Sequence, residues 1–232
     1  MKERPIIFSA PMVRAILEGR KTQTRRVLKP QPEPVYDDNG KLLAQRFPGN
    51  VGVPIVLRDI NKSILVQQHT LTACPYGVPG DRLWVRETWA PLSPDENWRP
   101  IAECNIEFKA DTPCAKYPGD WPEEEAKGND DAPKWRSPMF LPRWASRITL
   151  EIVGVRIERV QDISEADAMA EGVWQPGQVV HADMKGFHGT TNYSARNQFM
   201  HTWEAINFGR GYGWNSNPWV WVISFTRRLQ SE

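Results

Sequence analysis

The longest strand signal of the chain runs from 147 to 160, and it predicts that the fold contains a β-sheet. Its centre, Ile148 to Ile157, is dominated by β-branched and aliphatic side chains, which fit a pleated, half-buried surface. Gly154 lies within this stretch and predicts a bulge or a bend. Shorter strands are expected at 5–9, 22–28, within 80–89, at 106–109 and at 219–225.

Short helices are expected beside these strands, over 10–18, 165–171 and 195–206. A glycine follows each of the first two and ends it, since glycine readily adopts the left-handed backbone of a helix C-terminus. Ser164 and Asp167 form an S-x-x-D capping signature before the second helix. Short strands, few helices and long excursions together predict the α+β class, as a small mixed β-barrel with flanking short helices and long loop insertions.

The 232 residues are interpreted as a single domain, 1–232, because no internal repeat and no clean boundary is visible. Insertions are expected at about 30–80, 91–140 and 174–195. The middle insertion is rich in Pro, Gly, Trp and charge, a composition typical of loops.

Composition and cysteine spacing exclude several classes of protein. No stretch approaches the roughly 18 apolar residues of a membrane span, and no secretory signal is visible, so a cytoplasmic location is expected. Cys74, Cys104 and Cys114 are odd in number and irregular in spacing, which argues against a disulfide framework. His69 and Cys74 could share a metal, but no second pair accompanies them. Neither a metal nor a cofactor is therefore expected.

A basic run from Gly19 to Arg26 is the feature most informative about function. It packs four cationic side chains and two hydroxyls into eight residues. Crowded like charges repel, so an anion is expected to meet them, either a phosphate or a nucleotide. Neighbouring arginines also disfavour the charged form of Lys21 and make it easier to deprotonate. The run is thus suited to binding or to reaction.

The motif Gly-Arg-Lys-Thr-x-Thr-x-Arg after a helix, with Gly-Asp-x-Leu later at a strand start, resembles the ASCH family. The fold of that family is a PUA-like β-barrel. The matching pieces lie at 8–26, 79–89, 147–172 and 219–225, so the long insertions are not explained by the resemblance. The whole chain also resembles the longer ASCH-like proteins of bacteriophages and prophages, which share Cys-Pro-Tyr-Gly and Pro-Arg-Trp-Ala-Ser-Arg motifs.

Small ASCH enzymes that resemble this chain are amidohydrolases that remove the acetyl group from N(4)-acetylcytidine. Their lysine and threonine match Lys21 and Thr24, and their glutamate matches Glu171. The resemblance implies Lys21 as base, Thr24 as nucleophile and Glu171 as acid. Residues three apart on a regular strand point to opposite faces, so Lys21 and Thr24 converge only if the chain bends near 22–23. We predict such an irregularity just after Gly19.

Further side chains are candidates for holding the substrate. A guanidinium can clamp a phosphate or an acyl oxygen in a bidentate way. A glutamate on an apolar strand face can pair with an arginine of the basic run. Most of the eleven tryptophans are expected in the core, but one or two near the barrel mouth could stack on a base. The candidate substrate-binding residues are Arg20, Arg25, Arg26, Glu87, Trp84 and Trp89.

Three functions remain open from the sequence. The first is a hydrolase that removes an acyl group from the exocyclic amine of a modified cytidine-type nucleoside or base. The second is a non-catalytic reader of RNA or modified DNA. The third is a ribonuclease, although the four scattered histidines supply no pair for it. The expected partner is a modified nucleoside or nucleic acid and not a membrane, and the sequence is silent on oligomeric state.

Overall fold

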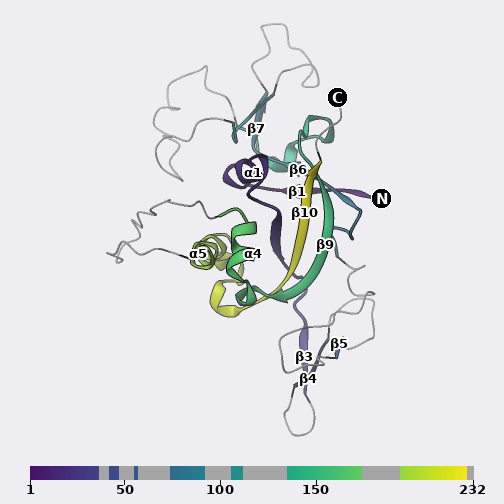
Figure 1. Ribbon diagram of the computed structural model, residues 1–232, viewed down its shortest axis with the longest axis vertical. Helices are drawn as coiled ribbons and strands as arrows, with labels where there is room; N and C mark the ends of the chain where they lie inside the picture. The colour runs from purple at the N-terminus through teal and green to yellow at the C-terminus, as the bar shows by residue number, and fades with distance from the viewer. Residues whose placement is uncertain are drawn as a thin grey trace, which may run out of the picture.

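A mixed five-stranded sheet forms the body of the protein in this computed structural model (Figure 1). The structure describes residues 1–36, 42–46, 55–56, 74–91, 106–111, 135–173 and 194–228. The strand order is β1-β6-β9-β10-β2, with β1 parallel to β6 and the other neighbours antiparallel. The bounds are β1 Glu3–Ile7, β2 Gln23–Val27, β6 Arg82–Arg86, β9 Thr149–Arg159 and β10 Trp219–Arg228.

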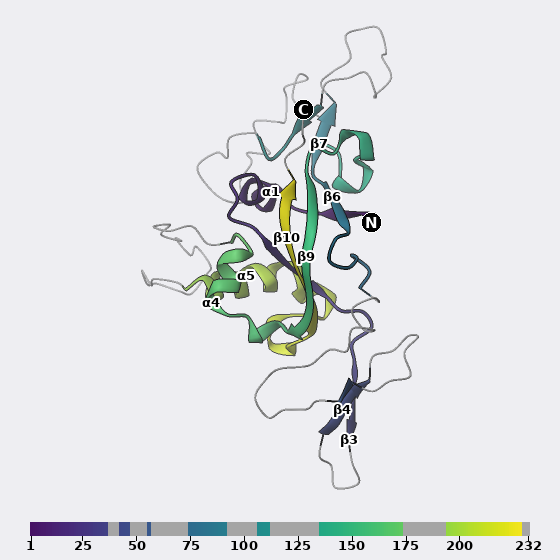
Figure 2. The ribbon, with the colours of Figure 1, turned by 45° about the vertical axis from the view of Figure 1, so that its right-hand side comes forward.

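The long strands β9 and β10 pair over their whole length, and their pairing contains a bulge. Ser224 pairs with Gly154 and Phe225 pairs with Ile152, so Val153 is the extra residue on β9. The irregularity predicted at Gly154 is therefore confirmed. A bulge bends a strand and increases its twist, and β9 curves visibly beside β10 in Figures 1 and 2.

The helices begin and end close to the predicted residues. Their bounds are α1 Ala10–Leu17, α4 Glu165–Ala170 and α5 Ala195–Asn207. The Ser164 hydroxyl accepts a hydrogen bond from the Asp167 N–H at 3.1 Å, which confirms the capping signature. Gly19 and Gly172 follow α1 and α4 with φ of +76° and +73°, so both act as the expected helix stops. Short 3-10 turns occur at Pro138–Phe140, Arg143–Ala145, Val160–Asp162, Phe208–Arg210 and Trp214–Ser216.

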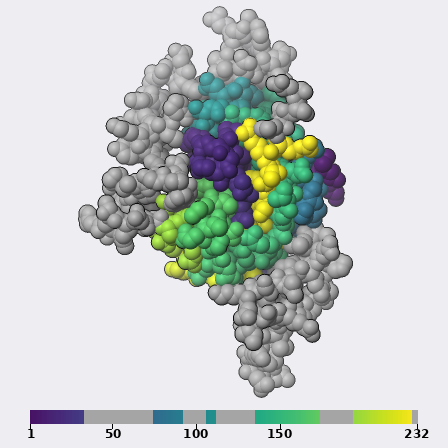
Figure 3. Space-filling model, viewed as in Figure 1, coloured from purple at the N-terminus to yellow at the C-terminus, as the bar shows by residue number. Residues whose placement is uncertain are grey.

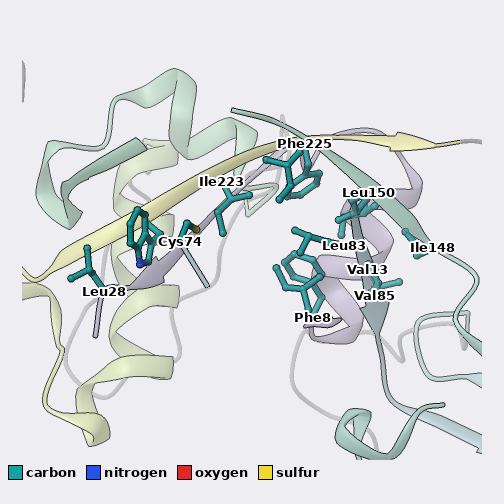
Figure 4. Packing of buried hydrophobic residues seen from close by; sticks show 14 of the residues in the cluster. Phe8, Val13, Leu28, Cys74, Leu83, Val85, Ile148, Leu150, Ile223 and Phe225 are labelled. Atoms are coloured by element: carbon teal, nitrogen blue, oxygen red, sulfur yellow. The ribbon is translucent and has the colours of Figure 1, made fainter. Parts of the chain in front are cut away.

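Strand β10 is buried on both faces from Trp219 to Ile223, and this part separates two hydrophobic clusters. Alternate side chains, such as Ile223 and Phe225, pack with Phe8 and Val13 in the larger cluster (Figure 4). The intervening residues Val220 and Val222 pack with α4 and α5 in the second cluster. A strand buried on both sides reads as a continuous apolar run, and Trp219 to Phe225 is such a run. Figure 3 shows α1 (purple) beside the final part of β10 (yellow).

The sheet is open, which corrects the prediction of a closed barrel. Strands β1 and β2 are its two edges, and no backbone pairing joins them in the described part of the chain. The edges are bridged instead by a side chain, because Arg26 Nη2 donates to the Ile7 carbonyl at 2.6 Å. The α+β class of the prediction holds.

Smaller sheets lie at the predicted insertions. One has the order β3-β4-β5 and falls within 30–80, and the other pairs β7 with β8 at the margin of 91–140. Figures 1 and 2 show β3 and β4 away from the five-stranded sheet. Their bounds are β3 Glu33–Tyr36, β4 Leu42–Arg46, β5 Ile55–Val56, β7 Trp89–Pro91 and β8 Ile106–Phe108. Most of the predicted 174–195 loop, Cys104 and Cys114 lie outside the described residues. No helix in the described ranges is long and apolar enough to cross a bilayer.

Candidate functional site

The start of β2 and the end of α4 meet at a pair of charged residues that are 150 positions apart in the chain. An isolated antiparallel bridge joins Lys21 to Glu171, and the Thr22 N–H donates to the Ala170 carbonyl at 2.9 Å. Lys21 thus lies outside β2, which begins at Gln23, so the chain leaves the regular strand where the irregularity was predicted. The backbones approach closely because residue 172 is glycine: a Cβ there would lie 2.7 Å from Lys21 Cβ.

The Lys21 side chain is completely enclosed and fully hydrogen-bonded. Its ammonium donates to the Gln23 carbonyl, the Glu171 carbonyl and Glu171 Oε2, each at 2.8 Å. An ammonium has three N–H groups, so all of them are used, and none is directed at Thr24. Burial lowers the pKa of Lys21, and Arg26 and Arg25 add to the lowering, while the contact with Glu171 opposes it.

Glu171 receives a second cation on its other oxygen. Arg25 Nη1 donates to Glu171 Oε1 at 3.1 Å. The same guanidinium also meets Glu158 and Asp167, the nearer at 2.5 Å, and it lies over the Phe199 ring at 5.7 Å. Arg25 is therefore a neutralised, buried cation whose position is fixed by carboxylates on β9 and α4.

A cavity of about 500 Å³ opens beside this pair, at the β2 edge of the sheet. Of the three predicted catalytic residues, Thr24 and Glu171 line it, while Lys21 is joined to it through its contact with Glu171. The side chain of Thr24 is buried, and no hydrogen bond within the described ranges uses its hydroxyl. The charged lining residues are Arg25, Arg26, Lys29, Arg210 and Glu171, and the aromatic ones are Tyr76, Phe199, Trp203, Tyr212 and Trp221.

Arg26 is the predicted clamp that the structure places in this cavity. Its guanidinium lies over the Phe8 ring at 5.1 Å, and burial is the main cause that lowers its pKa. Its Nε is buried without a hydrogen-bond partner in the described structure. An arginine keeps its charge even so, and the group is left with an unused donor beside the cavity.

Arg25 also lines this cavity, whereas the predicted substrate-binding residues Arg20, Glu87, Trp84 and Trp89 lie outside it. Arg20 donates to the Gly172 carbonyl and pairs with Glu18 near the surface. The Glu87 carboxylate forms a two-point contact with Arg147 at 3.0 Å for each oxygen, so its partner is not an arginine of the basic run. Burial raises the pKa of Glu87, against the effect of that arginine.

The rings of the two tryptophans proposed for base stacking already contact arginine side chains of the protein. The guanidinium of Arg86 lies 4.5 Å from the Trp84 ring centre, and that of Arg136 lies 5.2 Å from the Trp89 ring centre. Strand alternation identified Trp84 as facing away from Leu83, but alternation carries no information on which face borders a cavity. Neither indole lines the cavity described above.

Several lining residues were missed by sequence reasoning. Tyr76 comes from the turn after Cys74, where the Gly77 N–H donates to the Cys74 carbonyl at 3.1 Å. Arg210 and Tyr212 come from the connection between α5 and β10. The sequence does contain an indication of this connection. Three glycines alternate with an arginine and a tyrosine over 209–213, which is typical of a structured surface loop rather than of a flexible linker.

No cluster of three or more His, Cys, Asp or Glu side chains that could hold a metal occurs among the residues that the structure describes. Comparison of the chain with protein-family models, curated proteins and solved structures found no match.

Proposed function

We propose that this protein is a hydrolase that removes an acyl group from the exocyclic amine of a modified cytidine-type nucleoside or base, on a PUA-like fold of the ASCH type. The observation that carries the proposal is the meeting of distant residues at one cavity. Glu171 Oε2 lies 2.8 Å from Lys21 Nζ, and Glu171 lines with Thr24 a space of about 500 Å³. That volume falls within the usual range for small-molecule sites.

The buried pair supplies both a base and an acid. Burial disfavours charged groups and lowers the pKa of Lys21. In the proposed reaction, transfer of one proton from the Lys21 ammonium to the Glu171 carboxylate leaves an amine and a carboxylic acid, neither of which carries a charge. Two coupled groups of this kind share their protons as a unit. The neutral pair is the form with the two functions that amide hydrolysis requires.

The reaction then follows in balanced steps. The Lys21 amine gives up its hydrogen bond to Gln23, turns to Thr24 and accepts the hydroxyl proton as Oγ1 bonds to the acyl carbon. The bond from that carbon to the exocyclic nitrogen breaks, and the proton on Glu171 moves to the departing amine. Water attacks the acyl ester on Thr24, releases the carboxylic acid and restores the hydroxyl.

The walls of the cavity suit a planar, polar ring. The aromatic side chains on the lining can stack on a pyrimidine, and each such contact contributes about 1–3 kcal/mol. The charged lining residues provide the few polar contacts that orient such a ring. This combination supports a base or nucleoside as the substrate in preference to an aliphatic amide.

Turnover of N(4)-acetylcytidine tests the proposal. Thr24→Val should lower kcat on the order of 10³-fold or more, because it removes the nucleophile while conserving shape. Thr22→Val is the matched control, since Thr22 is exposed and lies two residues away. Its activity should stay within about twofold of the unchanged protein. Absence of turnover by the unchanged protein across a panel of N(4)-acylated cytidines and their monophosphates would overturn the proposal.

A second candidate function is non-catalytic binding of RNA or modified nucleic acid in the same cavity. The observation that favours it is the full use of the Lys21 N–H groups by protein acceptors, which is typical of a structural ammonium. It predicts salt-dependent binding with no change in the ligand. Product analysis by mass spectrometry after incubation separates the two functions. The ribonuclease alternative stays a prediction.

A further inference from the structure

We propose that the cavity contains a phosphate subsite formed by Arg26, Lys29 and Arg210, so that its ligand is a nucleoside monophosphate rather than a free nucleoside. This inference specifies the ligand class of the proposed hydrolase, and it therefore rests on the proposed function and on the same cavity. The subsite itself stands on charge, burial and loop geometry.

The first support is the imbalance of charge around the cavity. Among the residues that the structure describes, four cations and one carboxylate line it. The carboxylate, Glu171, already accepts from Lys21 and Arg25, and Arg25 is neutralised further by Glu158 and Asp167. The other three lining cations have no carboxylate within salt-bridge distance in the described part of the chain. Cations that converge without a counter-ion are the arrangement that recognises phosphate.

The second support is the unused donor of Arg26. Its Nη2 donates to the Ile7 carbonyl at 2.6 Å, while the buried Nε has no partner among the described residues. A buried donor without an acceptor is costly, and a bound oxyanion would satisfy it. Arg210 lines the same cavity as Arg26, and its charge lowers the pKa of Arg26 further.

The third support is that Lys29 and the connection carrying Arg210 are held in place by neighbouring residues. Lys29 Nζ lies 5.0 Å from the Tyr212 ring centre. Tyr212 is held in turn, because its carbonyl accepts from Trp203 Nε1 at 2.8 Å. Glu204 anchors the same connection by accepting from the Trp214 N–H at 2.5 Å. The loop that carries Arg210 is thus tied to α5 at two points, as expected of a preorganised anion site.

The volume of the cavity matches a single nucleotide. About 500 Å³ accommodates a base, a sugar and one phosphate, and it is small for several linked nucleotides. The aromatic lining residues can stack on the base, and Arg26, Lys29 and Arg210 can bind the phosphate.

Binding measurements by titration calorimetry at low salt test the subsite. The probes are cytidine, cytidine 5′-monophosphate, cytidine 3′-monophosphate and inorganic phosphate. One of the two monophosphates should bind at least about tenfold more tightly than cytidine, because charge-assisted hydrogen bonds are strong. In the double variant Lys29→Gln, Arg210→Gln, this preference should fall below about threefold. Both positions are exposed, so the fold should be retained.

The matched control is the double variant Arg227→Gln, Arg228→Gln. It removes the same charge from exposed positions at the other end of β10, outside the cavity lining. It should keep the preference for the monophosphate. Equal binding of cytidine and both monophosphates by the unchanged protein would overturn the subsite, as would an equal loss in the two double variants. Tighter binding of a cytidine oligonucleotide than of either monophosphate would also overturn it.

These outcomes are separate from those of the hydrolase. Binding of a monophosphate without deacetylation of N(4)-acetylcytidine or its monophosphates would leave the subsite in place and remove the proposed reaction. Deacetylation of the nucleoside with no preference for a monophosphate would do the reverse.

Discussion

Single residues determine how closely α4 approaches the start of β2, and Gly172 is the clearest case. Its φ is +73°, and an added Cβ would lie 2.7 Å from Lys21 Cβ and 2.8 Å from Ala15 Cβ. Gly172→Ala should therefore lower the free energy of unfolding by about 2–5 kcal/mol, the sum of left-handed strain and overpacking. Urea denaturation measures this change.

Gly19 supplies the control for that prediction. Its φ is +76°, but nothing lies within 4 Å of an added Cβ. Gly19→Ala should cost only the backbone strain of about 1–2 kcal/mol. Equal effects of the two substitutions would show that the close contact at Gly172 is unimportant.

Strands β1 and β6 are tied together by one carboxylate. Asp81 accepts from the Lys2 N–H at 2.7 Å and from Arg4 Nη1 at 2.8 Å. These hydrogen bonds lower the pKa of Asp81 from 3.8 to about 2, and the bond from Arg4 has the largest effect. Because the pKa is lower in the folded protein, the stabilisation is complete above about pH 4 and is lost as the pH falls to about 2.

Asp81→Asn tests how much the ionised Asp81 side chain stabilises the contact between β1 and β6. At pH 7 it should lower the free energy of unfolding by about 2 kcal/mol, the value of a shift of this size. The difference from the unchanged protein should shrink as the pH falls from 4 to 2 and should disappear below about pH 2, where both side chains are neutral. A difference that is constant over this range would show that the charge of Asp81 contributes nothing.

Most elements could be predicted because their signals are local. The Ser164 cap, the glycine stops and the Gly154 bulge each depend on residues close in sequence, and each was confirmed. The closed barrel was wrong, because pairing of the edges β1 and β2 depends on the curvature of the whole sheet. Lys29 and Arg210 were missed for a related reason: nothing near either residue in the sequence indicates that both border one cavity.

At the scale of the whole molecule, β10 contributes side chains to both hydrophobic clusters, so we expect the two clusters to unfold as one cooperative unit. Ile223 and Val222 are neighbours on this strand, but Ile223 packs in the cluster with Phe8 and Val222 packs in the cluster with α5. Ile223→Ala and Val222→Ala should each cost about 2–4 kcal/mol. Each should also shift the tryptophan-fluorescence and far-ultraviolet circular-dichroism transitions together, as in two-state unfolding. Separate transitions would show that the clusters unfold independently.

The position of β10 in the sheet also affects when the protein can assemble during its synthesis. This strand follows all the others in the chain, yet it lies between β9 and β2. A nascent polypeptide on the ribosome therefore holds β2 without its hydrogen-bonding neighbour until about residue 219 has emerged. The pocket cannot be complete before then, because Trp221 of β10 is one of its lining residues.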